Sequence, residues 1–348
     1  MAGLVPPAPS MNDWINTLLN VRRIGPAGGD AAAEAAARAA AASMAATGTV
    51  LVGDISNGLT SPHLLREAGL GGLVFHEVLG FSAEDPARIV RGAWEQVGLA
   101  AARLGSAAAA PSGSAFTAPI RFAVVAHAPY SVSPDLFREI ARRADGIPLT
   151  VHLGESPEEI TFLRTGGGPI RETLEVLGVW TDAWQVPECD PVTYLEELGY
   201  LRPGTIAVHC VHLRDDALAR LEAAGCVVVT CPRSNEWVGA GMPHVSHFYA
   251  SGVPVAIGTD SLASAPTLNL FDELAELRRI APDVTASSLL ESATRIGAEA
   301  LGFGRDYGTL GPGRRAALAV VSIPARVTDV EEYLVSGVPA SDIRRVSL

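Results

Sequence analysis

Seven short, uninterrupted apolar segments recur along this chain of 348 residues, and helix-length stretches separate them. The segments are rich in Val, Ile, Leu and Ala and do not alternate with polar residues. That pattern is typical of strands buried on both faces of a parallel sheet. Strands that alternate with helices indicate successive βαβ units. The predicted strands are 49–55, 72–79, 121–127, 148–153, 205–210, 226–231 and 254–260.

The stretches between these strands predict helices, and the strand count constrains the architecture. We expect helices at 31–46, 61–69, 84–105, 134–145, 156–178, 191–201, 214–224, 241–252, 268–281 and 285–301. A last short strand is expected at 316–321, and a loop rich in small residues at 106–119. A closed (β/α)8 barrel has eight strands, each followed by a helix. Seven strands therefore predict either an open sheet or a barrel that lacks its first strand.

The basic residues exclude several kinds of chemistry. All 26 of them are arginine, so the chain contains no lysine. Schiff bases, a phosphate-loop lysine and a lysine carbamate that bridges two metals are excluded, because arginine stays protonated at any working pH. The net charge of −12 disfavours nucleic acids and anionic membranes as partners. We expect a small-molecule partner and allow for a homodimer.

Cysteine usage and the N-terminal sequence predict a cytoplasmic protein. The four cysteines form no Cys-x-x-Cys pair and are expected to be reduced thiols. The first residues have no charged segment ahead of an apolar stretch and so do not resemble a signal peptide. The alanine-rich segment 31–46 is too short to span a bilayer.

Ionisable side chains gather at the carboxyl ends of the predicted strands. They are Asp54, His76, Glu77, His127, His152, His209 and Asp260. Catalytic groups of an α/β barrel come from this rim, because the βα loops converge there. A single histidine at a strand end is commonly structural, whereas a whole rim of such residues favours a site. Of the adjacent His76 and Glu77, we expect Glu77 to face the pocket.

The sharpest local motif is His152-Leu-Gly-Glu155, which closes a strand. A neutral imidazole at a strand end is a good ligand for a divalent metal. A carboxylate three residues later can reach back over the same position and carry protons between an attacking water and a leaving group. Asp260 also ends a buried strand, where it can bind a metal or take a proton from water.

Four motifs, in this order, resemble the amidohydrolase superfamily: VHLGESPEE, VHCVHL, CPRSNEWVGAGMP and VPVAIGTDSLAS. The resemblance covers about Trp14 to Val321 and is greatest to its aminohydrolase branch, which deaminates aminated heterocycles. The stretch HAPYSVSPDLF followed by HLGESPEE resembles the aminodeoxyfutalosine and S-adenosylhomocysteine deaminases in particular. It implies a metal-dependent hydrolase barrel of TIM type over 14–312. Residues 313–348 would hold a remnant of a small β-sandwich and a tail.

The resemblance also implies roles for single residues. His152 and Asp260 would bind one divalent metal, zinc first, with iron or manganese as alternatives. Glu155 would shuttle protons and contact substrate, His209 would orient the attacking water, and Asp260 would also be the general base. His127 would contact the substrate, as we expect of Glu77. The implied reaction is hydrolytic deamination of a nucleoside-type substrate.

One departure from the family stands out. Its first strand ends in a His-x-His pair that binds the metal, and this sequence contains no such pair. Either the sequence is part of a longer protein that carries the strand, which we favour because the other motifs look intact, or the metal site has degenerated. Two other functions therefore stay open: a different C–N or C–Cl hydrolysis on the same scaffold, and a ligand-binding protein without a metal.

Overall fold

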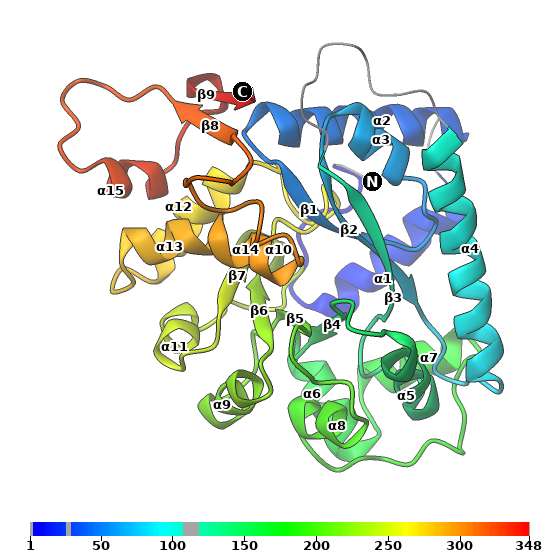
Figure 1. Cartoon of the computed structure of the whole chain (residues 1–348). Helices are drawn as coiled ribbons and strands as arrows, with labels where there is room; N and C mark the ends of the chain where they lie inside the picture. Colours follow the sequence, from blue (N-terminus) through cyan, green and yellow to red (C-terminus); the bar gives the residue numbers. More distant parts are fainter. Residues whose placement is uncertain (1–2, 26–28, 107–117, 348) are drawn as a thin grey trace.

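The computed structural model describes residues 3–25, 29–106 and 118–347. Strands and helices alternate through most of it (Figure 1). The parallel strands are β1 (Leu51–Ser56), β2 (Gly71–Val78), β3 (Ile120–Ala126), β4 (Thr150–Leu153), β5 (Ile206–His209), β6 (Val227–Thr230) and β7 (Val255–Ile257). All seven match the apolar segments that the sequence predicts to be strands.

Helices fill the connections between the strands. The first eight are α1 (Met11–Ile24), α2 (Gly29–Ala46), α3 (Pro62–Glu67), α4 (Pro86–Ser106), α5 (Pro134–Arg143), α6 (Pro157–Thr165), α7 (Pro169–Val176) and α8 (Pro191–Glu197). The next seven are α9 (Asp215–Ala223), α10 (Pro232–Trp237), α11 (Val245–Ala250), α12 (Leu270–Ile280), α13 (Ala286–Ser292), α14 (Arg295–Ala300) and α15 (Val330–Val335). Among the described residues, no helix is both long and apolar enough to cross a membrane.

The parallel strands form two hydrogen-bonded arrays in chain order, β1-β2-β3 and β4-β5-β6-β7. The arrays meet where His152 N donates to the carbonyl oxygen of His127 at 2.9 Å. Within the described residues, no ladder joins β7 back to β1. The predicted α/β class with parallel strands is confirmed, and the open edges of β1 and β7 agree with a count of seven strands.

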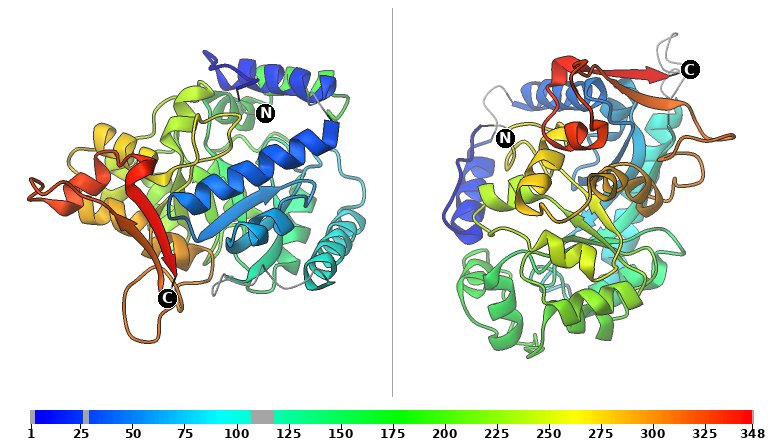
Figure 2. Two further views of the ribbon diagram at one scale, coloured as in Figure 1. Left: turned by 90° about the horizontal axis from the view of Figure 1, so that it is seen from above. Right: turned by 90° about the vertical axis from the view of Figure 1, so that its left-hand side faces the viewer.

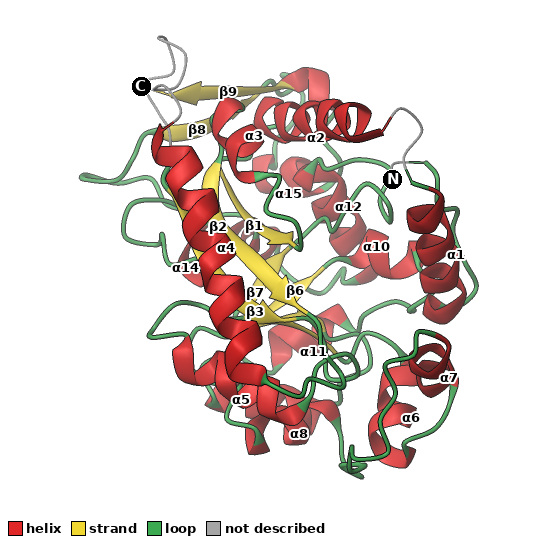
Figure 3. Cartoon of the chain, turned by 90° about the vertical axis from the view of Figure 1, so that its right-hand side faces the viewer, coloured by secondary structure: helices red, strands yellow, loops and turns green. Residues whose placement is uncertain are grey.

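Burial explains why the strand segments are continuously apolar. Every residue of β2 is buried, and α4 packs along β2 and β3 on their outer side (Figure 3). Gly72 lets β2 approach β1 closely, because a Cβ at this position would lie 2.0 Å from the carbonyl oxygen of Val52. Its φ of +134° also favours glycine.

The last two strands form a separate antiparallel hairpin of β8 (Ala317–Val321) and β9 (Ile343–Ser347). The hairpin lies beside α2 at one edge of the molecule (Figure 2). The sequence predicts β8 but not its partner β9. The predicted boundary between a barrel at 14–312 and a β-sandwich remnant at 313–348 stays a prediction.

Two predicted helices are broken in the structure. The segment 156–178 forms α6 and α7, because Gly166 and Gly168 take positive φ values of 69° and 90° and Pro169 starts a new helix. The segment 285–301 likewise forms α13 and α14. Most of the predicted loop 106–119 lies outside the described residues.

Tyr200 joins the two strand arrays, and its hydroxyl can be tested. The side chain is fully buried. Its hydroxyl accepts from Ala126 N and donates to the carbonyl oxygen of Thr150, both at 3.0 Å. Tyr200→Phe would leave the buried N–H donor and the buried carbonyl acceptor without a partner. We therefore expect the free energy of unfolding to fall by about 1–3 kcal/mol. Urea denaturation measures the change.

Tyr333→Phe is the control for this substitution, since the hydroxyl of Tyr333 makes no hydrogen bond to any described residue. It should leave the urea midpoint unchanged. If Tyr200→Phe is as stable as Tyr333→Phe, the bridge does not hold the arrays together.

Candidate active site

The side chains predicted to be functional meet at the rim formed by the carboxyl ends of the parallel strands. Glu77 lies in β2, His152 in β4, and His209 closes β5. His127 directly follows β3, and Asp260 follows β7. Parallel strands place their carboxyl ends on one side of a sheet, so residues far apart in sequence come together there.

Glu77, His127 and His152 form a cluster whose ligand atoms all lie within 4.8 Å of one another. Glu77 Oε1 is 3.4 Å from His152 Nδ1. Glu77 Oε2 accepts a hydrogen bond from Asn57 Nδ2 at 2.9 Å. One carboxylate and two imidazoles make a donor set that zinc and related ions use. This candidate metal site includes the predicted ligand His152 and does not include Asp260.

Two histidines of the rim are held through Nδ1. His152 Nδ1 lies 3.0 Å from the carbonyl oxygen of His127, and His209 Nδ1 lies 2.8 Å from Asn235 Oδ1. Each oxygen can only accept, so each Nδ1 carries the proton and each Nε2 keeps its lone pair. Histidines that bind metals are held in this way. The residues present therefore fit a divalent ion.

Glu155 lies in the turn after β4 and faces His209. Its Oε1 is 3.4 Å from His209 Nε2, and the rings of His209 and His152 stack with centroids 5.5 Å apart. Burial raises the pKa of the Glu155 carboxyl to about 7; His152 opposes the shift and Asp260 adds to it. A carboxyl that titrates near neutral pH can both give and take a proton.

Glu159 holds the turn that carries Glu155, and the sequence did not single it out. Its carboxylate is fully buried and accepts the backbone N–H groups of Gly154 and Glu155, at 3.0 and 3.1 Å. The pattern Ser156-x-x-Glu159 is that of a helix capping box, and Ser156 does cap α6. That pattern predicts that the Glu159 side chain reaches back to the start of its helix, but it does not predict the contact with the backbone of the turn that carries Glu155.

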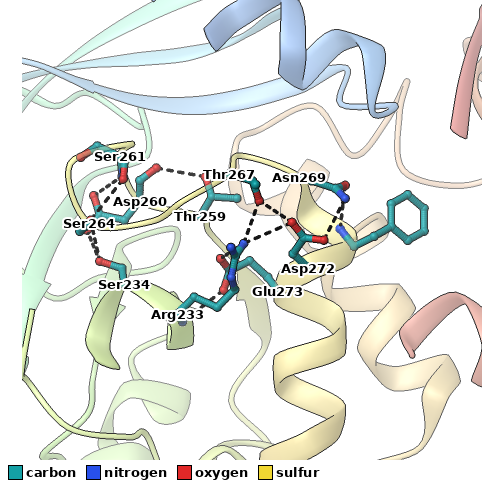
Figure 4. Close-up of polar contacts among 11 residues, drawn as sticks. Arg233, Ser234, Thr259, Asp260, Ser261, Ser264, Thr267, Asn269, Asp272 and Glu273 are labelled. Carbon is teal, nitrogen blue, oxygen red and sulfur yellow. Dashed lines mark hydrogen bonds and ion pairs between the residues drawn. The ribbon is translucent and has the colours of Figure 1, made fainter. Parts of the chain in front are cut away.

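Asp260 is held by hydroxyl groups from two segments (Figure 4). Its Oδ2 accepts from Ser234 Oγ at 2.6 Å and from Ser264 Oγ at 3.0 Å, and both serines are fully buried. Its Oδ1 accepts the N–H of Ser261 at 2.7 Å. Two donors occupy Oδ2 and one occupies Oδ1, so Oδ1 keeps the capacity to bind a metal or a water.

The backbone is strained at two of these strand ends. His209 and Asp260 have φ values of 74° and 55°, in the left-handed region that residues with a Cβ rarely adopt. Such strain costs on the order of 1–3 kcal/mol per residue and is concentrated at functional sites. It is consistent with the two side chains being aimed at the rim.

Burial favours the neutral form of two imidazoles of the rim, those of His127 and His209. It lowers the pKa of His127 to about 4, against an opposing effect of Glu77, and it also lowers the pKa of His209. A neutral imidazole can accept a proton or bind a metal. The site therefore offers the neutral imidazoles of His127 and His209 beside carboxyl groups.

The other polar residues of the predicted rim have structural contacts. Asp54 Oδ2 accepts from Ser61 Oγ at 2.5 Å. His76 Nδ1 lies 3.1 Å from the carbonyl oxygen of Ser56. His212 follows β5 and is not one of the predicted rim residues; its Nε2 lies 2.6 Å from the carbonyl oxygen of Ala240.

Comparison with known proteins identifies the family. The model of the amidohydrolase family matches residues 13–341. The chain belongs to the amidohydrolase family. The aminodeoxyfutalosine deaminase of Deinococcus radiodurans is 38% identical over 191 residues, which cover 53% of this chain and 46% of that protein. The 5-methylthioadenosine/S-adenosylhomocysteine deaminase of Syntrophobacter fumaroxidans is 36% identical over 239 residues, 65% of this chain and 50% of that protein. The chain thus spans about half the length of these curated relatives.

Solved structures share the fold of this amidohydrolase. The aminofutalosine deaminase of Helicobacter pylori in complex with methylthio-coformycin superimposes with a TM-score of 0.78 at 22% identity, over 96% of this chain and 78% of that one. A Xanthomonas campestris adenosine deaminase with bound zinc gives a TM-score of 0.70 at 24% identity, over 88% of this chain and 66% of that one. The predicted α/β fold and family are confirmed, and these neighbours are consistent with the predicted barrel.

Buried acids predict how stability depends on pH. Burial raises the pKa of Glu155 to about 7, and those of Glu159 and Glu273 to about 8. The native state then holds protons that the unfolded state releases above about pH 4.5, so native stability falls as pH rises through 7 and 8. We expect the urea midpoint of chelator-treated protein to decrease from pH 6 to pH 9.

Two variants separate this effect from a general response to alkali. A glutamine at position 159 cannot titrate, so Glu159→Gln should make the decrease of the urea midpoint between pH 6 and pH 9 smaller. Glu95→Gln, at an exposed position on α4, should leave the dependence of the urea midpoint on pH unchanged. A urea midpoint that rises or stays constant between pH 6 and 9 would contradict the raised pKa values of these acids.

Proposed function

We propose that this chain catalyses metal-dependent hydrolytic deamination of an adenine-type nucleoside. The observation that carries the proposal is the pair of Glu155 and His209, 3.4 Å apart beside His152 at the rim. The proposal is supported by the relatives at 38% and 36% identity, which are named as deaminases of aminodeoxyfutalosine and of 5-methylthioadenosine and S-adenosylhomocysteine.

Different residues of the rim transfer different protons in the proposed reaction. Protonated Glu155 can give its proton to the ring nitrogen of the substrate. A water oriented by His209 adds its oxygen to the ring carbon that bears the amino group and loses one proton to Asp260. Asp260 returns that proton to the amino group, the C–N bond breaks and ammonia leaves, and Glu155 takes back the proton of the added hydroxyl as the ring carbonyl forms. His127 and Glu77 also lie beside His152, where we propose that they contact the substrate. Tyr130 packs edge-on against His127.

The residues that would hold the metal are His152, through Nε2, and Asp260, through Oδ1. A catalytic zinc site usually takes three protein ligands, and Glu77 and His127 are the further donors beside His152. A divalent ion here would lower the pKa of water and polarise the substrate. We propose zinc, with iron or manganese as alternatives.

Two further parts of the proposal concern the setting of the enzyme. The cysteines in the described residues are all free thiols, which agrees with the cytoplasmic location we propose. We propose a small heterocyclic substrate as the partner, and the homodimer stays a prediction.

Glu155→Gln tests the reaction. The amide can neither give nor take the proton, so we expect ammonia release from 5'-deoxyadenosine and 5-methylthioadenosine to fall by about 10²–10⁴-fold. Zinc content should equal that of the unsubstituted protein, because Glu155 is not a proposed ligand. Ammonia release and elemental analysis measure the two quantities, with Glu95→Gln as the control.

Three results would contradict the proposal. A Glu155→Gln protein that keeps the parental rate would remove Glu155 from the reaction. Release of chloride or of a ring-opened product in place of ammonia, in a substrate panel, would indicate another hydrolysis. A parental protein that binds nucleosides but releases no ammonia would indicate a binding protein.

A further inference from the structure

The short helix α10 contacts two residues of the rim and the first turn of α12 through three consecutive residues. Asn235 Oδ1 accepts from Nδ1 of His209. Ser234 Oγ donates to Asp260 Oδ2. Arg233 reaches the first turn of α12, where its Nη1 lies 3.4 Å from Glu273 Oε1. The three residues lie in the motif CPRSNEWVGAGMP, whose sequence does not indicate these contacts.

We propose that Ser234 and Asn235 are positioning residues, which set the reactive atoms of Asp260 and His209. Asn235 keeps the proton of His209 on Nδ1, so that Nε2 faces Glu155 with a free lone pair. Ser234 occupies Asp260 Oδ2 and leaves Oδ1 to react. The assignment rests on the proposed function for its catalytic meaning, but the contacts themselves can be tested without turnover.

The amide of Asn235 supports a role in positioning over one in stability. Asn235 is fully buried, and its Nδ2 has no hydrogen-bond partner among the described residues. A buried donor without a partner costs about 1–3 kcal/mol. An apolar residue of similar size would avoid that cost, so the contact between Oδ1 and His209 is what the asparagine provides.

Arg233 fixes α10 against the other end of the loop that starts at Asp260. Its Nη1 donates to Thr267 Oγ1 at 3.1 Å and lies 3.6 Å from Asp272 Oδ2. Glu273 beneath it is fully buried. Adjacent residues of α10 therefore hold the start and the end of one loop, as Figure 4 shows. These contacts at both ends of the loop limit the movement of Asp260 relative to His209.

Nuclear magnetic resonance of the ¹⁵N-labelled histidine rings tests Asn235 directly. His209 is assigned by the signal that disappears in His209→Gln. In the metal-free parent we expect the tautomer with the proton on Nδ1. Asn235→Leu should give a mixture of tautomers or the proton on Nε2, whereas Asn235→Asp keeps an acceptor and should restore the parental tautomer. Urea denaturation confirms that each variant is folded.

Zinc affinity tests Ser234. Loss of a group that orients a metal ligand commonly weakens binding 10–100-fold, and we expect about tenfold for Ser234→Ala. Ser246→Ala is the matched control, because it removes a similar 2.6 Å hydrogen bond from a serine to Asp283 on the surface. It should leave zinc affinity unchanged.

The outcomes separate the positioning role from the proposed reaction. If folded Asn235→Leu keeps the parental tautomer, or folded Ser234→Ala binds zinc as tightly as the parent, that residue's positioning role is wrong. If Asn235→Leu does not fold, Asn235→Ala takes its place in the same spectra. A parent that shows the expected tautomer but releases no ammonia would overturn the deaminase proposal and leave the positioning role intact.

Discussion

One carbonyl oxygen connects the fold to the site. The carbonyl of His127 accepts both the backbone N–H of His152, at 2.9 Å, and its ring Nδ1–H, at 3.0 Å. The first bond joins the array that ends with β3 to the array that begins with β4. The second aims the Nε2 of His152 at the rim. Any shift of the two arrays would therefore also turn the proposed metal ligand.

Several other features of the rim lower the stability of the native state. His209 and Asp260 hold left-handed backbone conformations, and Glu155 and Glu159 bury carboxyl groups whose pKa values rise for that reason. Asn235 leaves a buried donor unpaired. Each feature is unfavourable by itself, and each places or tunes a group that the proposed reaction needs. This concentration is what separates a reactive site from a packed strand end.

The sequence predicts the strands well because burial on both faces leaves a local signature, seen in the largely apolar segment of β2, all of whose residues are buried. It also predicts the rim residues, since strand ends are defined by the strands. It does not predict Ser234, Asn235 or Glu159 as part of the site, because their partners depend on how α10 and α6 pack. The prediction of a single helix over 156–178 is wrong, because the conformation of the glycines at 166–168 ends the helix that the periodicity indicates. The strand β9 is not predicted, because arginines interrupt its apolar pattern.

His152 lies close to two groups of side chains on which the proposed reaction depends. The first is Glu77 and His127; the ring centroid of His127 is 4.8 Å from that of His152. The second is His209 and Glu155, to which the proposal assigns proton transfer. An ion bound through His152 would lie beside both groups, so substrate held by the first would meet the proton donors of the second. Because burial lowers the pKa of His127 to about 4, that imidazole stays neutral at neutral pH and does not repel the ion.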